Sequence, residues 1–160
     1  MLRPSDPADQ TSFYSGKNKR HTVKNVLLIH ALIILFLSDT FEGSVHDKAI
    51  TDLTPYPLQE GSELVDDLGF LGYELAGVTH IRPFKKPKGG KLSAEQKAHN
   101  RLVAQRRIVA EHVIRSVKRC RMVKDTIRLW KDGLKDMVME VSCGLHNFRV
   151  RTTPWPSSHS

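Results

Sequence analysis

Two carboxylates, Asp67 and Glu111, stand in a part of the chain that is crowded with lysine and arginine. Asp67 lies in the run DDLGF of residues 66–70, and Glu111 lies in the run RRIVAEHVI of residues 106–114. Carboxylate oxygens bind hard divalent cations, and the surrounding positive side chains can hold a polyanion. Together these residue types indicate metal-dependent chemistry on a phosphodiester.

Glu111 also has a simpler interpretation as a partner in ordinary salt bridges. On a helix its neighbours one turn away are Arg107 and Arg115, and such i,i+4 pairs contribute only about 0.2–0.5 kcal/mol. It is the only acidic residue between Glu95 and Asp125. Both interpretations of Glu111 stay open at the level of the sequence.

Asp67 has an alternative role as well, because an Asp before Leu-Gly commonly ends a strand by hydrogen-bonding its own turn. Strand ends in open α/β sheets are also the places where ligands bind, so the position permits either role. Asp66 is a neighbouring carboxylate, and alternation along a strand points the two side chains in opposite directions. Only one of them can then enter a shared site.

The positive charge is distributed unevenly over the 160 residues, which are enough for one domain. The formal net charge is +8, but residues 81–131 hold 16 Lys and Arg against 3 acidic residues, a balance of +13. The remaining residues carry a balance of −5. This asymmetry favours contact with a nucleic acid or another anionic surface, and a solvated basic helix is the alternative.

The cysteines and the most apolar run point away from zinc, disulfides and a membrane. Cys143 and His146 have metal-ligand spacing but no second such pair, so Cys120 and Cys143 are expected to be reduced, buried thiols in an intracellular protein. Residues 26–37 are too few to span a bilayer and do not fit a signal peptide. They are interpreted as parts of two adjacent buried strands, near residues 21–30 and 32–38.

The remaining chain alternates strands with helices and predicts an α/β class. Residues 1–19 are expected to form a loop and residues 39–45 a turn, and residues 85–91 a mobile basic loop. Further expected elements are a helix over 46–53, strands over 64–67 and 78–83, a helix from 93 to about 124, and a helix over 134–148. Residues 1–151 are taken as one domain and 152–160 as a disordered tail.

The two long helices carry specific expectations. Ser93 and Gln96 match the capping box, in which each side chain bonds the backbone N–H of the other residue. The first helix is expected to bury one apolar stripe: Leu102, Val109, Val113 and Val117. The last helix is expected to bury another: Leu134, Met137, Val138, Val141, Leu145 and Phe148.

Several motifs, in register over residues 3 to about 151, give the chain a resemblance to a known family. It resembles bacterial insertion-sequence transposases, and within them the DDE superfamily endonucleases related to the Harbinger transposases. The similar segments are residues 13–24 (FYSGKNKRHTVK), 43–48 (GSVHDK), 67–70 (DLGF), 85–87 (KKP), 92–97 (LSAEQK), 100–101 (NR), 111–114 (EHVI) and 117–119 (VKR).

The resemblance implies an RNase H-like fold, with a central mixed sheet flanked by helices. It implies an active site of Asp, Asp and Glu that holds two divalent ions, usually Mg²⁺ with Mn²⁺ as a substitute, for DNA cleavage and strand transfer. Asp67 matches the second acidic position and Glu111 the third. Basic residues are expected to contact phosphates of the transposon ends and the target DNA: Lys85, Lys86, Arg107, Arg115, Lys118 and Arg119.

The first acidic position has no counterpart in this sequence. The family's first Asp lies in an Asp-Gly-Thr motif just upstream of the Arg-Pro seen here as Arg3 and Pro4. The chain is therefore expected to lack the first catalytic strand and to need an upstream-encoded half for activity. The alternative is an inactive remnant that binds DNA without sequence specificity. An exposed sheet edge would favour pairing with another chain, including a homo-oligomer, and the family implies a bacterial cytoplasmic protein associated with the nucleoid.

Overall fold

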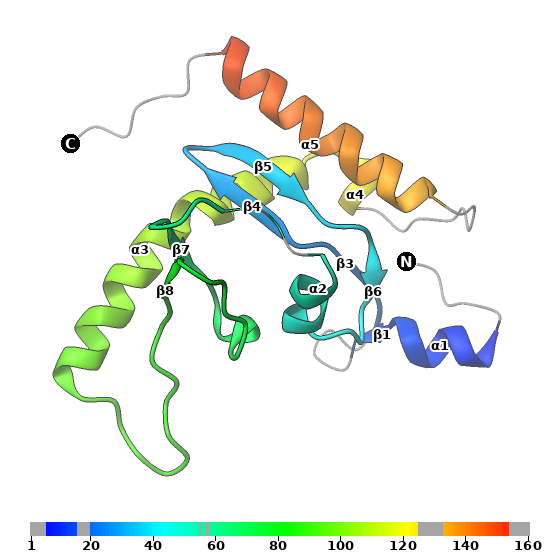
Figure 1. Ribbon diagram of the computed structural model, residues 1–160. Helices are drawn as coiled ribbons and strands as arrows, with labels where there is room; N and C mark the ends of the chain where they lie inside the picture. The colour runs from blue at the N-terminus through cyan, green and yellow to red at the C-terminus, as the bar shows by residue number, and fades with distance from the viewer. Residues whose placement is uncertain (1–5, 16–19, 55, 57, 125–132, 154–160) are drawn as a thin grey trace. The chain divides into compact units, whose positions relative to one another are not determined.

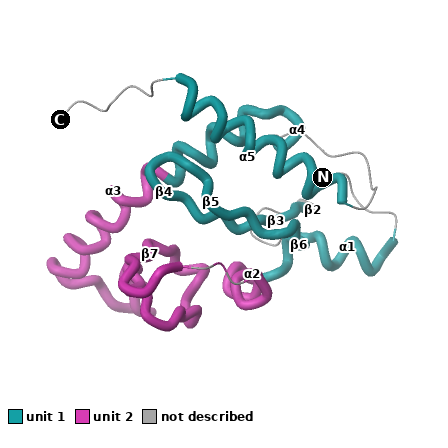
Figure 2. The backbone as a smooth tube through the Cα atoms, turned by 45° about the horizontal axis from the view of Figure 1, so that its top comes forward, with its two compact units in different colours: residues 1–45, 110–160 teal, residues 46–109 magenta. Residues whose placement is uncertain are grey.

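The computed structural model describes residues 6–15, 20–54, 56, 58–124 and 133–153. The chain divides into two compact units, which are coloured separately in Figure 2. Unit 1 comprises residues 1–45 and 110–160, and unit 2 comprises residues 46–109. The boundary falls inside one long helix, α3 (Ala94–Val117), so this helix contributes residues to both units.

Unit 1 begins with a helix, α1 (Pro7–Phe13), where the sequence was expected to form a loop. Asp6 caps it, because its carboxylate accepts a hydrogen bond of 2.7 Å from the backbone N–H of Ala8. Proline at the first helical position has its φ angle already set for a helix. The expected loop was wrong here, because Pro7 does not break this segment and an Asp-Pro pair is a favourable start for a helix.

A β-hairpin forms the centre of unit 1. Strands β4 (Leu27–His30) and β5 (Ile33–Leu37) pair antiparallel, with Leu27 opposite Leu37 and His30 opposite Ile33 (Figure 1). The two-residue turn between them places Ala31 and Leu32 at φ of 45° and 72°, the left-handed conformation that tight hairpin turns require. The two strands expected in this region are confirmed. The expectation that both faces of these strands are buried is wrong, because Leu35 is 59% exposed.

Unit 1 also contains two further pairs of short strands, each a separate two-stranded sheet. β3 (Val23–Lys24) pairs antiparallel with β6 (Phe41–Glu42), which lies within the segment expected to be a turn. β1 (Tyr14–Ser15) pairs antiparallel with β2 (Arg20–His21).

The last helix, α5 (Leu134–Thr152), packs against β5 and confirms the expected helix with one more turn at its end. Asn147 binds β5 as a neighbouring strand would: it accepts from the N–H of Ile34 at 2.9 Å and donates to its carbonyl at 2.8 Å. The buried side chains of α5 are Ser142, Cys143 and His146.

The prediction that the apolar stripe of α5 faces the core was wrong. Four of its residues are about half or more exposed: Met137, Val141, Leu145 and Phe148. The polar side chains of His146 and Asn147 dock on backbone groups of the hairpin instead. Since those hydrogen bonds set the rotation of the helix, hydrophobic periodicity alone gave the wrong face.

The long helix α3 ends at Val117, seven residues before the expected end, and a short helix, α4 (Arg121–Lys124), follows. The capping box is confirmed, with Ser93 and Gln96 bonded reciprocally at 3.0 and 3.1 Å. At the other end the backbone tightens, because the N–H of Cys120 donates to the carbonyl of Val117 three residues back. Such tightening is common at helix ends and needs neither proline nor glycine.

The apolar stripe expected on α3 is confirmed only in its last part. Val113 and Val117 are buried and belong to the core of unit 1, with Ile34 and Cys143. Leu102 and Val109 are 62% and 42% exposed. The two halves of α3 belong to different units, so one continuous stripe need not be covered along its whole length.

Unit 2 contains the expected helix α2 (Asp47–Leu53) and two short parallel strands, β7 (Glu63–Val65) and β8 (Thr79–Ile81). A single 3₁₀ turn, η1 (Leu68–Phe70), follows β7. The basic segment of residues 85–91 has no helix or strand, as expected. The described residues are thus a mixed α/β structure with two-stranded sheets, while the RNase H-like sheet and the missing strand stay predictions.

Candidate active site

Asp67 lies just beyond the end of β7 and caps η1. Its Oδ1 atom accepts a hydrogen bond of 2.7 Å from the backbone N–H of Leu68, so the turn-forming role considered from the sequence is confirmed. Its Oδ2 atom lies 2.9 Å from Nη2 of Arg107 on α3. The side chains of Asp67 and Arg107 are 49% and 32% exposed. Asp67 therefore presents a solvent-accessible carboxylate, which can bind a cation, beside a guanidinium, which can bind a phosphate.

The turn that contains Asp67 packs against the start of α2. A side chain at Gly69 would meet the Asp47 carboxylate, because an added Cβ atom would lie 2.7 Å from Asp47 Oδ2. A larger residue at this position would therefore require the Asp47 side chain to move.

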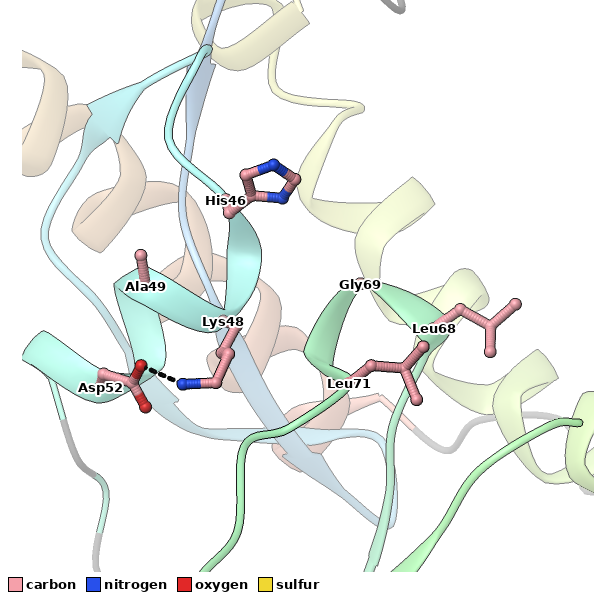
Figure 3. A pocket seen from close by; sticks show the side chains of 7 residues that line it. All are labelled: His46, Lys48, Ala49, Asp52, Leu68, Gly69 and Leu71. Atoms are coloured by element: carbon pink, nitrogen blue, oxygen red, sulfur yellow. Dashed lines mark hydrogen bonds and ion pairs between the residues drawn. The ribbon is translucent and has the colours of Figure 1, made fainter. Parts of the chain in front are cut away.

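A pocket lies between α2 and η1, the 3₁₀ turn that directly follows Asp67 in the chain (Figure 3). An ion pair of 2.6 Å between Lys48 and Asp52 lies on its α2 side. The pocket is lined by His46, Lys48, Ala49, Asp52, Leu68, Gly69 and Leu71.

Asp66 lies in a different environment from its neighbour. It is only 7% exposed, and its Oδ2 atom lies 2.9 Å from both His80 Nδ1 and Arg82 Nε. The Leu75 N–H donates to His80 Nε2, which assigns the ring hydrogen to Nδ1 beside Asp66, and Arg82 Nη2 lies 2.7 Å from the same Nδ1 atom. The different environments of Asp66 and Asp67 agree with the opposite orientations that strand alternation predicts.

Asp66, His80 and Arg82 form a buried cluster, and Arg82 also has partners outside it. It donates to Glu74 Oε1 at 2.6 Å and to the carbonyl of Tyr73. The hydrogen bond from Arg82 lowers the pKa of Glu74. Burial by itself lowers the pKa of Arg82, but hydrogen bonds with Glu74 and Asp66 outweigh it and raise the pKa overall. Burial is also the main cause that raises the pKa of Tyr56 and of Tyr73.

Sequence reasoning missed the roles of His80 and Arg82. The signal was present, because the two residues are two positions apart in an expected strand and therefore share one face. What the sequence did not contain was the parallel pairing of β8 with β7, in which Val65 lies opposite Ile81. That register brings both side chains to Asp66.

Glu111 is an exposed residue of α3. Arg107, one helical turn before it, pairs with Asp67, and no described residue forms an ion pair with Glu111. Within the described residues the structure therefore shows no salt bridge of Glu111 with Arg107 or Arg115. Asp67 belongs to unit 2 and Glu111 to unit 1, and the structure describes each within its own unit.

The expected DNA-contacting residues are mostly exposed. Lys85 and Lys86 follow Phe84, whose backbone N–H and carbonyl are held by the Asn100 side chain at 2.7 and 3.0 Å. This anchor fixes the start of the basic loop to α3 within unit 2. Exposed basic residues also occupy the end of α3 and the turn after it: Arg115, Lys118 and Arg119.

Cys143 and His146 do not form a metal site. Burial raises the pKa of the Cys143 thiol to about 11. Both cysteines are free, but Cys120 is only partly buried, so the expectation of two buried thiols holds for Cys143 alone. His146 Nε2 donates to the carbonyl of Leu32 at 2.8 Å, and its Nδ1 lies 2.9 Å from the Ser116 hydroxyl. Among the described residues no three His, Cys, Asp or Glu side chains lie close enough to hold a metal ion together.

Comparison with known proteins identifies the family. The family model of the DDE superfamily endonucleases matches residues 1–147. The chain belongs to this family. It is 37% identical over 111 residues to a probable transposase for insertion sequence element IS702 from Microchaete diplosiphon. That match covers 68% of this chain and 40% of the relative, so the chain corresponds to less than half of that protein. No solved structure matches.

Membership in the DDE superfamily endonucleases confirms the resemblance stated from the sequence motifs, and the matched region contains both Asp67 and Glu111. Among the described helices, none combines the length and the apolar character that crossing a bilayer requires.

Proposed function

We propose that this chain carries part of the catalytic centre of a transposase that cleaves DNA and joins the cut strand to a target. The observation that supports this most is the placement of Asp67. It follows a strand of unit 2, is half exposed, and lies 2.9 Å from the guanidinium of Arg107. A DDE superfamily endonuclease needs a carboxylate that solvent and a phosphodiester can both reach, and Asp67 meets that requirement.

Asp67 and Glu111 are the residues that would hold the divalent cation, Mg²⁺ or Mn²⁺. The donor type fits, because both are carboxylates and both are accessible. When bound, such ions supply activation of the attacking hydroxyl and stabilisation of the leaving oxygen. The chain's own contribution is to hold Asp67 in its turn through Leu68 N–H and to place Arg107 where a phosphate oxygen can accept from it.

The basic residues would bind the DNA backbone. The exposed lysines of the loop and the arginines of α3 can neutralise phosphates without reading sequence. We propose this role for Lys85, Lys86, Arg107, Arg115, Lys118 and Arg119. The transposon ends and the target would be the substrates, and the bacterial nucleoid the place of action.

A second candidate function is DNA binding without catalysis. The family uses three acidic positions, and the Asp-Gly-Thr motif of the first does not occur in these 160 residues. Two carboxylates hold a pair of ions less firmly than three. The first Asp would then come from outside these 160 residues, and an upstream-encoded half is the source that we propose.

Calorimetry with Mn²⁺ tests the metal assignment without any need for catalysis. We expect Asp67→Asn and Glu111→Gln each to weaken binding, because each removes a charged ligand. Glu63→Gln is a matched control, since it removes an exposed carboxylate that pairs with Arg106 at 3.1 Å. Equal binding by the control and a site variant would refute the role of that site residue.

Cleavage of a supercoiled plasmid in Mn²⁺ then separates the two candidate functions. The chain is assayed alone and mixed with a polypeptide that contains the corresponding Asp-Gly-Thr segment. Cleavage that appears only in the mixture, and is lost with Asp67→Asn, supports the split catalytic centre. Retention of DNA without cleavage under either condition supports binding alone.

A further inference from the structure

Both oxygens of the Asp67 carboxylate already have partners within unit 2. Oδ1 accepts from the backbone of its own turn at 2.7 Å, and Oδ2 accepts from Arg107 at 2.9 Å. The backbone bond is local and compatible with a cation on the remaining lone pairs. The guanidinium is different, because its positive charge repels a cation at the same oxygen. Asp67 is therefore held in a form that resists metal binding.

Arg107 is also a group for which a DNA phosphate competes well. A guanidinium forms paired, charge-assisted hydrogen bonds with phosphate as readily as with carboxylate. Its side chain is 32% exposed, so a phosphate can approach without unfolding the unit. The ion pair with Asp67 is partly solvated and weak enough to exchange.

We propose that Arg107 moves from Asp67 to a DNA phosphate when DNA binds, and that this exchange frees the Asp67 carboxylate for a divalent cation. The inference rests on the proposed function, and it adds a regulation of that site: the metal is bound about two- to five-fold more tightly when DNA is present. By linkage, the metal tightens DNA binding by the same factor as DNA tightens metal binding.

The expected coupling is modest, because the ion pair is partly exposed. Exposed ion pairs change an equilibrium by about two- to five-fold, and this sets the scale for the release of Arg107. We expect Arg107→Gln to bind Mn²⁺ about two- to five-fold more tightly than the wild type when no DNA is present. The substitution removes the competing guanidinium and leaves Asp67 unchanged.

Arg106→Gln is the matched control for this substitution. Arg106 is the preceding residue of α3, carries the same charge, and pairs with Glu63 at 3.1 Å, with both side chains more than half exposed. It lies outside the proposed metal and DNA contacts. Both variants lose one positive charge from the same turn of the helix, so a difference between them reports on the partner of Arg107.

Two measurements on the full chain test the exchange. Calorimetry gives the Mn²⁺ affinity of the protein alone, and fluorescence anisotropy of a labelled duplex gives DNA affinity with and without Mn²⁺ at constant ionic strength. The ratio of the two DNA affinities is the coupling factor. Mn²⁺ that binds the duplex itself affects all variants alike, so the factor for each is compared with that for Asp67→Asn. Circular dichroism checks that every variant is folded.

We expect a coupling factor that is about two- to five-fold larger in the wild type and in Arg106→Gln than in Arg107→Gln and Asp67→Asn. Unchanged Mn²⁺ affinity in Arg107→Gln, or a coupling factor equal to that of Arg106→Gln, would overturn the exchange while the metal site stands. Unchanged Mn²⁺ affinity in Asp67→Asn would instead remove Asp67 from the metal site and overturn the proposed function there.

Discussion

Replacing Arg82 by methionine tests the buried cluster of Asp66, His80 and Arg82. The Asp66 side chain is 6% exposed, and its Oδ2 atom accepts from His80 and Arg82, each at 2.9 Å. Methionine keeps much of the side-chain volume but donates no hydrogen bond, so Asp66 would retain only His80. Breaking a buried ion pair by removing one partner costs about 3–5 kcal/mol. Because His80 remains, we expect the lower end, about 3 kcal/mol of unfolding free energy.

Arg106→Met is the control for the loss of an arginine as such. Its ion pair with Glu63 has 56% and 61% exposed side chains, and exposed pairs contribute about 0.2–1 kcal/mol. Urea unfolding followed by far-ultraviolet circular dichroism gives both free energies. The two variants should therefore differ by roughly 2 kcal/mol or more.

A second substitution separates the charge from the packing of Arg82. Asp66→Asn in the Arg82→Met background removes the uncompensated charge, so it should recover part of the lost free energy. If Arg82→Met were destabilised no more than Arg106→Met, the cluster would not hold a buried charge and our account of unit 2 would be refuted. If Asp66→Asn gave no recovery in the double variant, the loss would come from packing instead.

Three further predictions concern unit 1. Val113→Ala should cost on the order of 2 kcal/mol because the side chain is fully buried, whereas Leu145→Ala on the exposed face of α5 should change stability by less than about 0.5 kcal/mol. Asn147→Ala should cost about 1–3 kcal/mol, because it leaves the N–H and carbonyl of Ile34 without their partner. Stability should fall between about pH 9 and 11, because the Cys143 thiol ionises near 9 in the unfolded chain but near 11 when folded.

Urea unfolding measures all three. Equal losses for Val113→Ala and Leu145→Ala would mean that the stripe on α5 is covered after all. A loss below about 0.5 kcal/mol for Asn147→Ala would mean that its hydrogen bonds to β5 do not anchor the helix. For the thiol, the neutral form is favoured by folding, so the slope above pH 9 should be smaller in Cys143→Ala; an unchanged slope would assign it to other groups, such as Tyr56 and Tyr73, whose pKa values are also raised.

The sequence by itself was sufficient for local features. The capping box at Ser93 and Gln96, the helix α2 and the paired strands β4 and β5 were all predicted, because each depends on neighbours within a few residues. The family followed from short motifs in register, and so did the choice of Asp67 as a candidate. These features are encoded in residue order and need no knowledge of packing.

The tertiary structure decided which partners the side chains have. Arg107 pairs with Asp67, 40 positions away, and not with Glu111 one turn along the same helix. Asp66 acquires His80 and Arg82 through the parallel pairing of β7 with β8. Contacts of this kind form only when distant segments pack together, so the periodicity of one segment cannot predict them.

The orientation of α5 shows the same limit. Its hydrophobic pattern predicted a buried face with Leu145 and Phe148, yet both are exposed while His146 and Asn147 bind the hairpin backbone. Backbone groups at the hairpin need hydrogen-bond partners, and leaving a buried one unpaired costs about 1–3 kcal/mol. The sequence determined that this segment is a helix, and only the packed structure determined which side of it faces the core.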